Sequence, residues 1–395
     1  VPNSTLHKLY DAAWTFGLHA AATSLYASCR SIRVHNQHVY PPPRHSPLSW
    51  LLHHLTHEVK NMYLARQLVE QVFHTAAPIA PSSRATFIAH AAEQGFALAA
   101  RGLWERYAGG RFGSLVTASG TLLVRMVSLY ASLARRERRL IRINIPKDGE
   151  AVELSHDARR PYFVKRRARH DEYVKFARRV LNTFREAKGP LESASREDLN
   201  ALARAHFLLH DLNEGFDVLA LITKRAEVPD MRDINVALGA VAFENPSVAL
   251  RMVERMTVRR RRPDNVTVGT IIHQALRKRL LDVAEDALQF AAQHNIPLDL
   301  KTVESIIRVS LDISQDDSEV TTDNLRRALH ILRENEALSY LARAPLGELC
   351  ATAAAAAGDA ALAYDFWHEM VRRKADWKDA ERGEVRKRIM RAVWR

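Results

Sequence analysis

Clusters of basic residues are the part of this sequence whose types and spacing most directly indicate chemistry. Arginines fill positions 259–262, and a second cluster between 159 and 169 surrounds two adjacent aromatic residues. Guanidinium and ammonium groups bind phosphates and release counterions, while aromatic rings stack on nucleobases. The residues predicted to bind phosphate or stack on bases are Arg159, Arg160, Tyr162, Phe163, Lys165, Arg166, Arg167, Arg169, Arg259, Arg260, Arg261 and Arg262.

The chain as a whole is also basic. Its 395 residues include 58 Lys and Arg against 45 Asp and Glu, a formal net charge of +13. This excess favours a polyanionic partner, nucleic acid first and an anionic membrane surface second. Other interpretations stay open. Part of 259–262 could offset a helix dipole, and the cluster at 159–169 could be a solvated loop or a contact to ribosomal RNA or an acidic protein.

No arrangement typical of an active site is present. The sequence has no GxGxxG, GxxxxGK[ST] or GxSxG motif, so we predict no catalytic residue and no cofactor. His53, His54 and His57 could place two imidazoles on one helix face. No cysteine or carboxylate accompanies them at metal-ligand spacing, so no metal site is predicted.

A recurring apolar quadruplet predicts the elements that must position these residues. Its spacing of i, i+3, i+4, i+7 puts four side chains on one face of a helix. Successive quadruplets start 34 to 43 residues apart, with one gap of 77, and each interval holds two helices and two turns. A single unit of this kind cannot bury its apolar face. We therefore predict an all-α fold, a right-handed α-solenoid of about nine helix-turn-helix repeats.

Prolines mark the boundaries between repeats. Pro229, Pro263 and Pro297 are 34 residues apart, and proline disfavours helix in the residue before it. Charge runs and a Pro-Lys-Asp-Gly turn signal interrupt the pattern and predict an insertion with a small hairpin. The predicted division is 1–134 as N-terminal helical repeats, 135–170 as the basic insertion, 171–376 as further repeats and 377–395 as a C-terminal capping helix.

Two local patterns resemble the pentatricopeptide repeat. One is the Pro-Asp boundary, as at Pro263-Asp264, followed five residues later by a small or polar residue early in the next helix. The other is Ala-x-x-Leu-Phe-x-x-Met in the second helix, best matched by 363–370 after Gly358-Asp359. The resemblance is clearest over 196–300 and 345–375.

The resemblance implies a mode of base recognition. In that family each repeat can read one base of single-stranded RNA through a side chain early in its first helix and another at the repeat's end. Carried over, it pairs Asn200 with Asp230 and Asn235 with Asp264, a combination similar to those that prefer uridine. Amide and carboxylate groups can supply donors and acceptors to a Watson–Crick edge. The alternative is that the asparagines are helix-start residues and the aspartates turn residues.

The resemblance also implies a role. It predicts a monomeric, non-enzymatic protein that binds single-stranded RNA, mitochondrial mRNA or rRNA, and supports transcript stability, processing or translation. Mitochondrial ribosomes or RNA-processing proteins would be further partners, and mitochondrial localisation follows from the resemblance alone. No run of eighteen apolar residues occurs, so no membrane span is predicted. The alternatives are a tetratricopeptide-like protein-interaction scaffold, although its Trp-x-x-Leu-Gly-x-x-Tyr pattern is not found, or a mitochondrial ribosome-associated protein.

Overall fold

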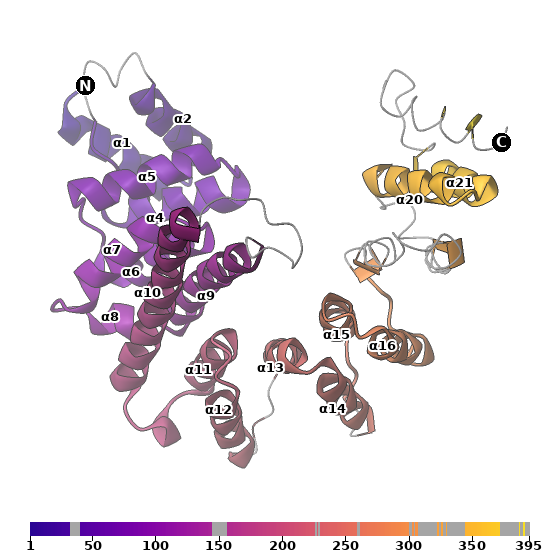
Figure 1. The fold of residues 1–395 in the computed structure, drawn as a ribbon. Coiled ribbons are helices and arrows are strands. Elements are labelled where there is room, and N and C mark those ends of the chain that lie inside the picture. Colours follow the sequence, from indigo (N-terminus) through magenta and orange to yellow (C-terminus); the bar gives the residue numbers. More distant parts are fainter. Residues whose placement is uncertain are drawn as a thin grey trace. The chain divides into compact units, whose positions relative to one another are not determined.

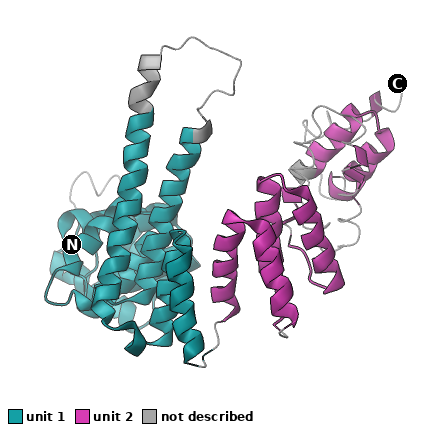
Figure 2. Ribbon diagram, turned by 60° about the horizontal axis from the view of Figure 1, so that its bottom comes forward, with its two compact units in different colours: residues 1–229 teal, residues 230–395 magenta. Residues whose placement is uncertain are grey.

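The chain folds into helices, as seen in a computed structural model. The structure describes residues 1–31, 40–143, 156–225, 227, 230–258, 261–299, 302–303, 305–306, 322–323, 325–326, 329, 344–371, 387 and 390–391. Over these residues every regular element is a helix and none is a strand. The helices form two compact units, unit 1 (Val1–Pro229) and unit 2 (Asp230–Arg395), which Figure 2 colours separately.

Unit 1 is a succession of helical hairpins, labelled in Figure 1. Its elements in chain order are α1 (Asn3–Thr15), α2 (His19–Arg30), α4 (His45–His53), the π-helical turn η1 (His54–Glu58), α5 (Met62–Thr75), η2 (Pro81–Ser83), α6 (Arg84–Glu93), α7 (Ala97–Ala108), α8 (Ser114–Thr117), α9 (Gly120–Ile143), α10 (His156–Lys188), η3 (Leu191–Ser193), α11 (Arg196–Leu208) and α12 (Leu212–Lys224). Helices pair as α1 with α2, α6 with α7, α9 with α10 and α11 with α12, and α4, α6, α9 and α11 pack on one another in succession.

Unit 2 repeats the same construction. Its elements are α13 (Met231–Glu244), α14 (Pro246–Val258), α15 (Asn265–Arg277), α16 (Leu281–Gln293), α20 (Ala344–Ala356), α21 (Ala360–Phe366) and the π-helical turn η5 (Trp367–Val371). Helices pair as α13 with α14, α15 with α16, and α20 with α21, and α13 also packs on α15. The predicted all-α class of helix-turn-helix repeats is therefore confirmed.

The apolar quadruplets form the buried stripes. Ala65, Leu68, Val69 and Val72 of α5 are fully buried, as are Ala363 and Phe366 of α21. These side chains lie between paired helices, so the hydrophobic spacing in the sequence reports the packing face of each hairpin.

A helix cap recurs at the start of each first helix between residues 195 and 302. Ser195, Asp230 and Asp264 are N-caps whose side chains accept a hydrogen bond from the backbone N–H three residues later. Asp299 makes the same contact with the N–H of Thr302, at 2.8 Å. N-caps satisfy donors that the first turn of a helix leaves without partners. This periodic cap keeps the register of successive repeats.

The segment 135–170 differs from the predicted insertion. Its described parts, 135–143 and 156–170, are helical and belong to α9 and α10, which lie side by side in both views (Figures 1 and 2). Arg166 of α10 donates to Glu137 of α9 at 2.7 Å, and the ring centroids of Tyr130 and Phe176 lie 4.6 Å apart. The charge runs are thus the polar faces of two helices that share an apolar seam.

Two predicted features lie outside the described residues. The small hairpin would fall within 144–155, and most of the capping helix at 377–395 is also outside. The compact units divide at 229/230, and the predicted boundaries near 134 and 170 stay a prediction. Helices α9 and α10 pack with the helices on both sides of them in the chain, so unit 1 includes both.

Candidate nucleic-acid interface

Helix α10 carries the strongest positive charge of any described helix in unit 1. Between His156 and Lys188 it has eleven Lys and Arg residues against four Asp and Glu. Lys165, Arg167 and Arg169 are exposed, and no ion pair joins them to any residue that the structure describes. Free exposed cations in one stretch of helix are suited to bind phosphates, because no internal carboxylate competes for them.

Helix α9 contributes further cations next to the exposed cations of α10. The ion pair between Arg166 and Glu137 sets the two helices beside each other at these positions. Residues on either side of this ion pair are exposed on both helices. We call the exposed set the α9–α10 basic surface, defined by Arg136, Arg138, Arg139, Lys165, Arg167 and Arg169.

Some predicted members of the basic cluster do not belong to this surface. Arg166 is held by the buried carboxylate of Glu137, so its role is to join two helices. Phe163 is half-buried. Arg159, Arg160 and Tyr162 lie in the first turns of α10, but their side chains are outside the description. The sequence alone could not separate Arg166 from its neighbours, since its partner lies on another helix.

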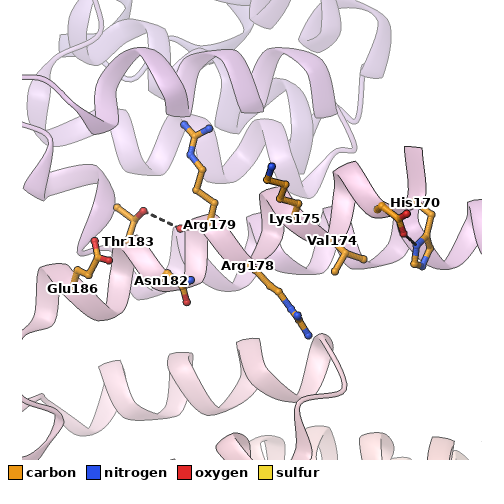
Figure 3. A pocket seen from close by; sticks show the side chains of 9 residues that line it. His170, Val174, Lys175, Arg178, Arg179, Asn182, Thr183 and Glu186 are labelled. Atoms are coloured by element: carbon orange, nitrogen blue, oxygen red, sulfur yellow. Dashed lines mark hydrogen bonds and ion pairs between the residues drawn. The ribbon is translucent and has the colours of Figure 1, made fainter. Parts of the chain in front are cut away.

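A groove of about 630 Å³ continues along α10 beyond the predicted cluster, from His170 to Glu186. Figure 3 shows Lys175, Arg178 and Arg179 projecting from this stretch of the helix. Arg178 pairs with Asp211 at 2.9 Å, and Arg179 pairs with Glu105 at 3.3 Å. Exposed pairs of this kind contribute little free energy, so a phosphate can replace the carboxylate. This groove was not predicted from the sequence, although basic residues continue along the chain after position 170.

Unit 2 brings one predicted base-reading pair together. Asn235 Nδ2 donates to both carboxylate oxygens of Asp264 at 3.1 Å. The hydroxyl of Thr267 lies within hydrogen-bond distance of both Asp264 and Asn235, and the N–H of Thr267 donates to Asp264 at 2.8 Å. The resemblance therefore paired two residues that are in direct contact. Thr267, which completes the network, was not predicted.

The carboxylate of Asp264 is held in its charged form. Burial by itself raises the pKa of Asp264, but hydrogen bonds from Thr267 and Asn235 outweigh burial and lower that pKa below its ordinary value. The carboxylate therefore remains an acceptor at neutral pH. It serves both as the N-cap of α15 and as a partner of Asn235, so the turn-residue interpretation of this aspartate holds alongside any contact with a base.

A hollow of about 1030 Å³ opens beside Asp264. Arg261 and Arg262 line it together with Asp264, and so do the polar residues Gln293 and Asn295 at the end of the next hairpin. Two of the four predicted arginines of 259–262 thus lie next to a predicted base-reading residue, while Arg259 and Arg260 are outside the described residues. The arrangement offers cations for a phosphate and polar atoms for a base in one place.

The second predicted pair is not brought together within one unit. Asn200 lies on α11 of unit 1, and its Oδ1 is buried without a hydrogen-bond partner in the described part of the chain. Asp230 begins unit 2, where it accepts from the N–H of Asp233 at 2.7 Å as the N-cap of α13. The structure describes each residue only in its own unit, and their pairing remains a prediction.

Two groups of His and Glu side chains in unit 1 have the composition of a metal site. One comprises His57, His90 and Glu93, and the other His19, His54 and Glu58. In each group the potential ligand atoms lie within 4.8 Å of one another. The carboxylate that the local sequence did not supply to His57 comes from a different helix.

Among the described helices, none has a stretch of apolar residues long enough to cross a bilayer. The two longest, α9 and α10, carry the charges described above.

Comparison with known proteins identifies structural similarity without sequence similarity. No family model matches the chain, and no curated protein matches it. Among solved structures the chain is similar to the crystal structure of the pentatricopeptide repeat protein PPR10 from maize, with a TM-score of 0.44 and 13% identity. That alignment covers 100% of this chain and 56% of PPR10. PPR10 in complex with an 18-nt psaJ RNA element gives a TM-score of 0.37 and 16% identity, covering 99% of this chain and 51% of that one.

This chain therefore spans about half the length of the PPR10 chains to which it is similar. The similarity concerns an all-α architecture of helical hairpins.

Proposed function

We propose that this protein binds single-stranded RNA through the α9–α10 basic surface and the hollow beside Asp264. The observation that carries the proposal is the set of exposed cations Lys165, Arg167 and Arg169, which no described carboxylate neutralises. Backbone phosphates of RNA supply the missing negative charge, and binding gains free energy from released counterions. The net charge of +13 acts in the same direction over the whole chain.

The hollow beside Asp264 is suited to a single strand rather than a duplex. Bases of a duplex are paired, whereas those of a single strand present their Watson–Crick edges to protein side chains. Asn235 and Asp264 offer an amide and a carboxylate next to the arginines Arg261 and Arg262. The amide of Asn235 and the carboxylate of Asp264 would contact a uridine edge, while the arginines hold the adjacent phosphate.

The cellular role that we propose follows the resemblance to pentatricopeptide repeats. The RNA would be a mitochondrial mRNA or rRNA, and binding would support its stability, processing or translation, with the mitochondrial ribosome or RNA-processing proteins as further partners. The protein would act as a monomer and without catalysis. Fractionation of cells that express the full-length protein, followed by sequencing of cross-linked RNA, tests this role. Recovery of nuclear transcripts alone would argue against it.

The test of RNA binding uses the purified chain and short single-stranded RNA pools with and without uridine tracts. The triple variant Lys165→Ala/Arg167→Ala/Arg169→Ala should bind all pools more weakly than the wild type. The matched control, Lys8→Ala/Arg251→Ala/Arg255→Ala, removes the same charge from exposed positions on α1 and α14. A wild type that binds no RNA at low salt, or equal losses in both triple variants, would refute the proposed surface.

A protein-interaction scaffold is the second candidate. Its specific support is the exposure of Tyr63 and Leu98, large apolar side chains at 71% and 75% exposure on α5 and α7. A scaffold function does not account for the exposed cations Lys165, Arg167 and Arg169 of α10, because a peptide-binding face needs no such charge. Absence of RNA binding in the assay above would favour this candidate.

A further inference from the structure

The first histidine and glutamate group links successive hairpins of unit 1. His57 lies on η1, while His90 and Glu93 lie on the last turn of α6. Helix α6 packs against α4 and α9, so the three side chains meet where these elements converge. The ring of His53, at the end of α4, stacks on His57 with centroids 4.5 Å apart and planes 11° apart.

The spacing of the potential ligand atoms is that of a metal centre. Glu93 Oε2 lies 3.7 Å from His57 Nε2 and 3.7 Å from His90 Nδ1. Two ligands bonded to one zinc ion at about 2.0–2.1 Å in a tetrahedral arrangement are roughly 3.4 Å apart. These two distances exceed this value by a few tenths of an ångström, and all three potential ligand atoms lie within 4.8 Å of one another, so side-chain rotations would bring them onto one ion.

Hydrogen bonds already orient the imidazole of His57. Its Nδ1 lies 3.3 Å from the carbonyl oxygen of His53 and 2.8 Å from the hydroxyl of Thr56. The carbonyl can only accept, and the Thr56 hydroxyl can itself donate to the carbonyl of Leu52 at 2.9 Å. When the Thr56 hydroxyl donates to Leu52, Nδ1 of His57 can donate its own proton to these oxygens, and the lone pair of Nε2 is then available to an ion. Imidazole ligands of metals are commonly fixed in this way through their other nitrogen.

His90 adds a nitrogen with no other use in the fold. Its Nδ1 is buried and has no hydrogen-bond partner among the described residues, and the side chain is 16% exposed. A buried polar atom without a partner costs free energy that a bound cation would recover.

Arg125 of α9 is a positive charge next to this site, and it would repel a bound cation. It pairs with Oε1 of Glu93, which leaves Oε2 facing the two histidines. Its guanidinium fixes the orientation of the carboxylate in the manner of an outer hydrogen-bond partner. The same positive charge weakens the attraction for a cation, so the affinity should be lower than that of a site made of thiolates.

We propose that His57, His90 and Glu93 bind a divalent transition-metal ion, with Zn²⁺ as the best match, and thereby tie η1 to α6. Two imidazoles and one carboxylate are ligands that Zn²⁺ accepts, and three protein ligands leave a fourth position for water. The side chain of His57 is 37% exposed, which gives an ion access from solvent. This inference does not depend on the proposed RNA binding.

The second group provides a control within the same turn. Its His54 Nδ1 and Glu58 Oε2 are 2.7 Å apart and hydrogen-bonded to each other, so both atoms already have a partner. Glu58 is therefore not expected to be a ligand. His74 at the end of α5 is exposed and lies in neither group.

The test is titration of the chelator-treated full chain with Co²⁺, read by the visible absorption of tetrahedral Co²⁺, followed by displacement with Zn²⁺. We expect one equivalent of Co²⁺ to bind, Zn²⁺ to displace it, and Mg²⁺, which prefers oxygen ligands, to fail. His57→Ala and Glu93→Gln should each weaken binding by about tenfold or more. Glu58→Gln and His74→Ala should leave the affinity within about twofold of the wild type.

Melting curves give a second measurement that needs no spectroscopic probe. An ion that binds only the folded state raises the melting temperature, so Zn²⁺ should stabilise the wild type and Glu58→Gln but not Glu93→Gln. Circular dichroism of each variant without metal shows whether it is folded. Absence of Co²⁺ binding by the wild type, or unchanged binding in folded His57→Ala and Glu93→Gln, would overturn the proposal.

Discussion

Individual residues of the candidate interface serve the fold and the ligand together. Asp264 caps α15 through the N–H of Thr267 and also accepts from Asn235. A repeat protein gains from this combination, because the cap that fixes the start of a helix also fixes the position of the group that would meet a base. Substitutions at this residue therefore need variants that separate the two roles.

The cap of Asp264 can be tested by removing its acceptor. Asp264→Ala should lower the free energy of unfolding by about 1 kcal/mol, because the first turn of α15 loses its side-chain acceptor. Asp264→Asn keeps an oxygen at that position and should lose much less. Chemical denaturation followed by circular dichroism measures both. Equal losses for Ala and Asn would show that the cap contributes nothing.

The charge of Asp264 predicts a dependence on pH. The folded pKa of this carboxyl lies below its ordinary value, so the unfolded state takes up the proton first as the pH falls. Its contribution to stability is complete above the unfolded pKa of about 3.9 and is lost as the pH falls through the folded pKa. The stability difference between wild type and Asp264→Asn should thus be constant near neutral pH and shrink below about pH 4. A difference independent of pH down to acid unfolding would contradict this.

At the scale of elements, the α9–α10 pair shows how one basic cluster divides between structure and binding. Glu137 is a buried carboxylate on α9, and Arg166 is the cation that pairs with it. The cations next to Arg166 in the sequence, Lys165 and Arg167, are exposed. One helical turn thus contains both a structural cation and candidate ligands for phosphate.

Replacing Arg166 should therefore destabilise the protein more than replacing its neighbour Arg167. Arg166→Ala leaves the buried charge of Glu137 without its partner, and we expect a loss of about 2 kcal/mol. Arg167→Ala removes an exposed charge and should change stability by about 0.5 kcal/mol or less. RNA binding should show the opposite order, with Arg167→Ala having the larger effect. Denaturation and RNA titration of the same two variants decide the assignment.

Close contact between α11 and α12 gives a second prediction at this scale. A Cβ added to Gly215 would lie 2.7 Å from a ring carbon of Phe207, closer than such atoms approach. Overpacking in Gly215→Ala should lower the free energy of unfolding by about 1–3 kcal/mol. The better helix propensity of alanine should offset up to about 1 kcal/mol of this loss.

Gly239→Ala is the matched control for Gly215→Ala. Its added Cβ would meet only Thr270 Cγ2, at 3.6 Å, an ordinary contact. This variant should be neutral or more stable than the wild type by up to about 1 kcal/mol. If both alanine variants melt at the same temperature, the close approach of α11 and α12 is not what excludes a side chain at 215.

At the scale of the whole molecule, each of the two units carries one part of the proposed RNA interface, and the two parts differ in kind. Unit 1 carries the α9–α10 basic surface, whose proposed ligand is phosphate and therefore no particular sequence. Unit 2 carries Asn235 and Asp264 beside Arg261 and Arg262, where polar groups can distinguish bases. Affinity and sequence preference should therefore be separable by mutation.

A salt series measures that separation. The variant Lys165→Ala/Arg167→Ala/Arg169→Ala should weaken binding to every single strand, and it should reduce the slope of log affinity against log salt by about 2, since each phosphate contact contributes about 0.7. Asn235→Ala should leave the slope unchanged and lower only the preference for uridine. Equal binding of Asn235→Ala and wild type to all sequences would eliminate base reading by this residue while leaving phosphate binding in place.

The helical repeat could be predicted from the sequence alone, because its signals are local. Apolar quadruplets, boundary prolines and cap residues act within one helix or one turn, and the described hairpins follow them. The pairing of Asn235 with Asp264 was predicted from the resemblance to pentatricopeptide repeats, and the two side chains are hydrogen-bonded in the structure.

Only the tertiary structure decided which polar residues have partners. Arg166 and Arg167 are the same residue type, yet Arg166 pairs with Glu137 and Arg167 forms no ion pair with any described residue. His57 had no carboxylate at metal spacing in the sequence, and Glu93 approaches it from another helix. The physical reason is that ion pairs and metal ligands require atoms within about 4 Å in space, a condition that distant parts of the chain satisfy only after the helices have packed.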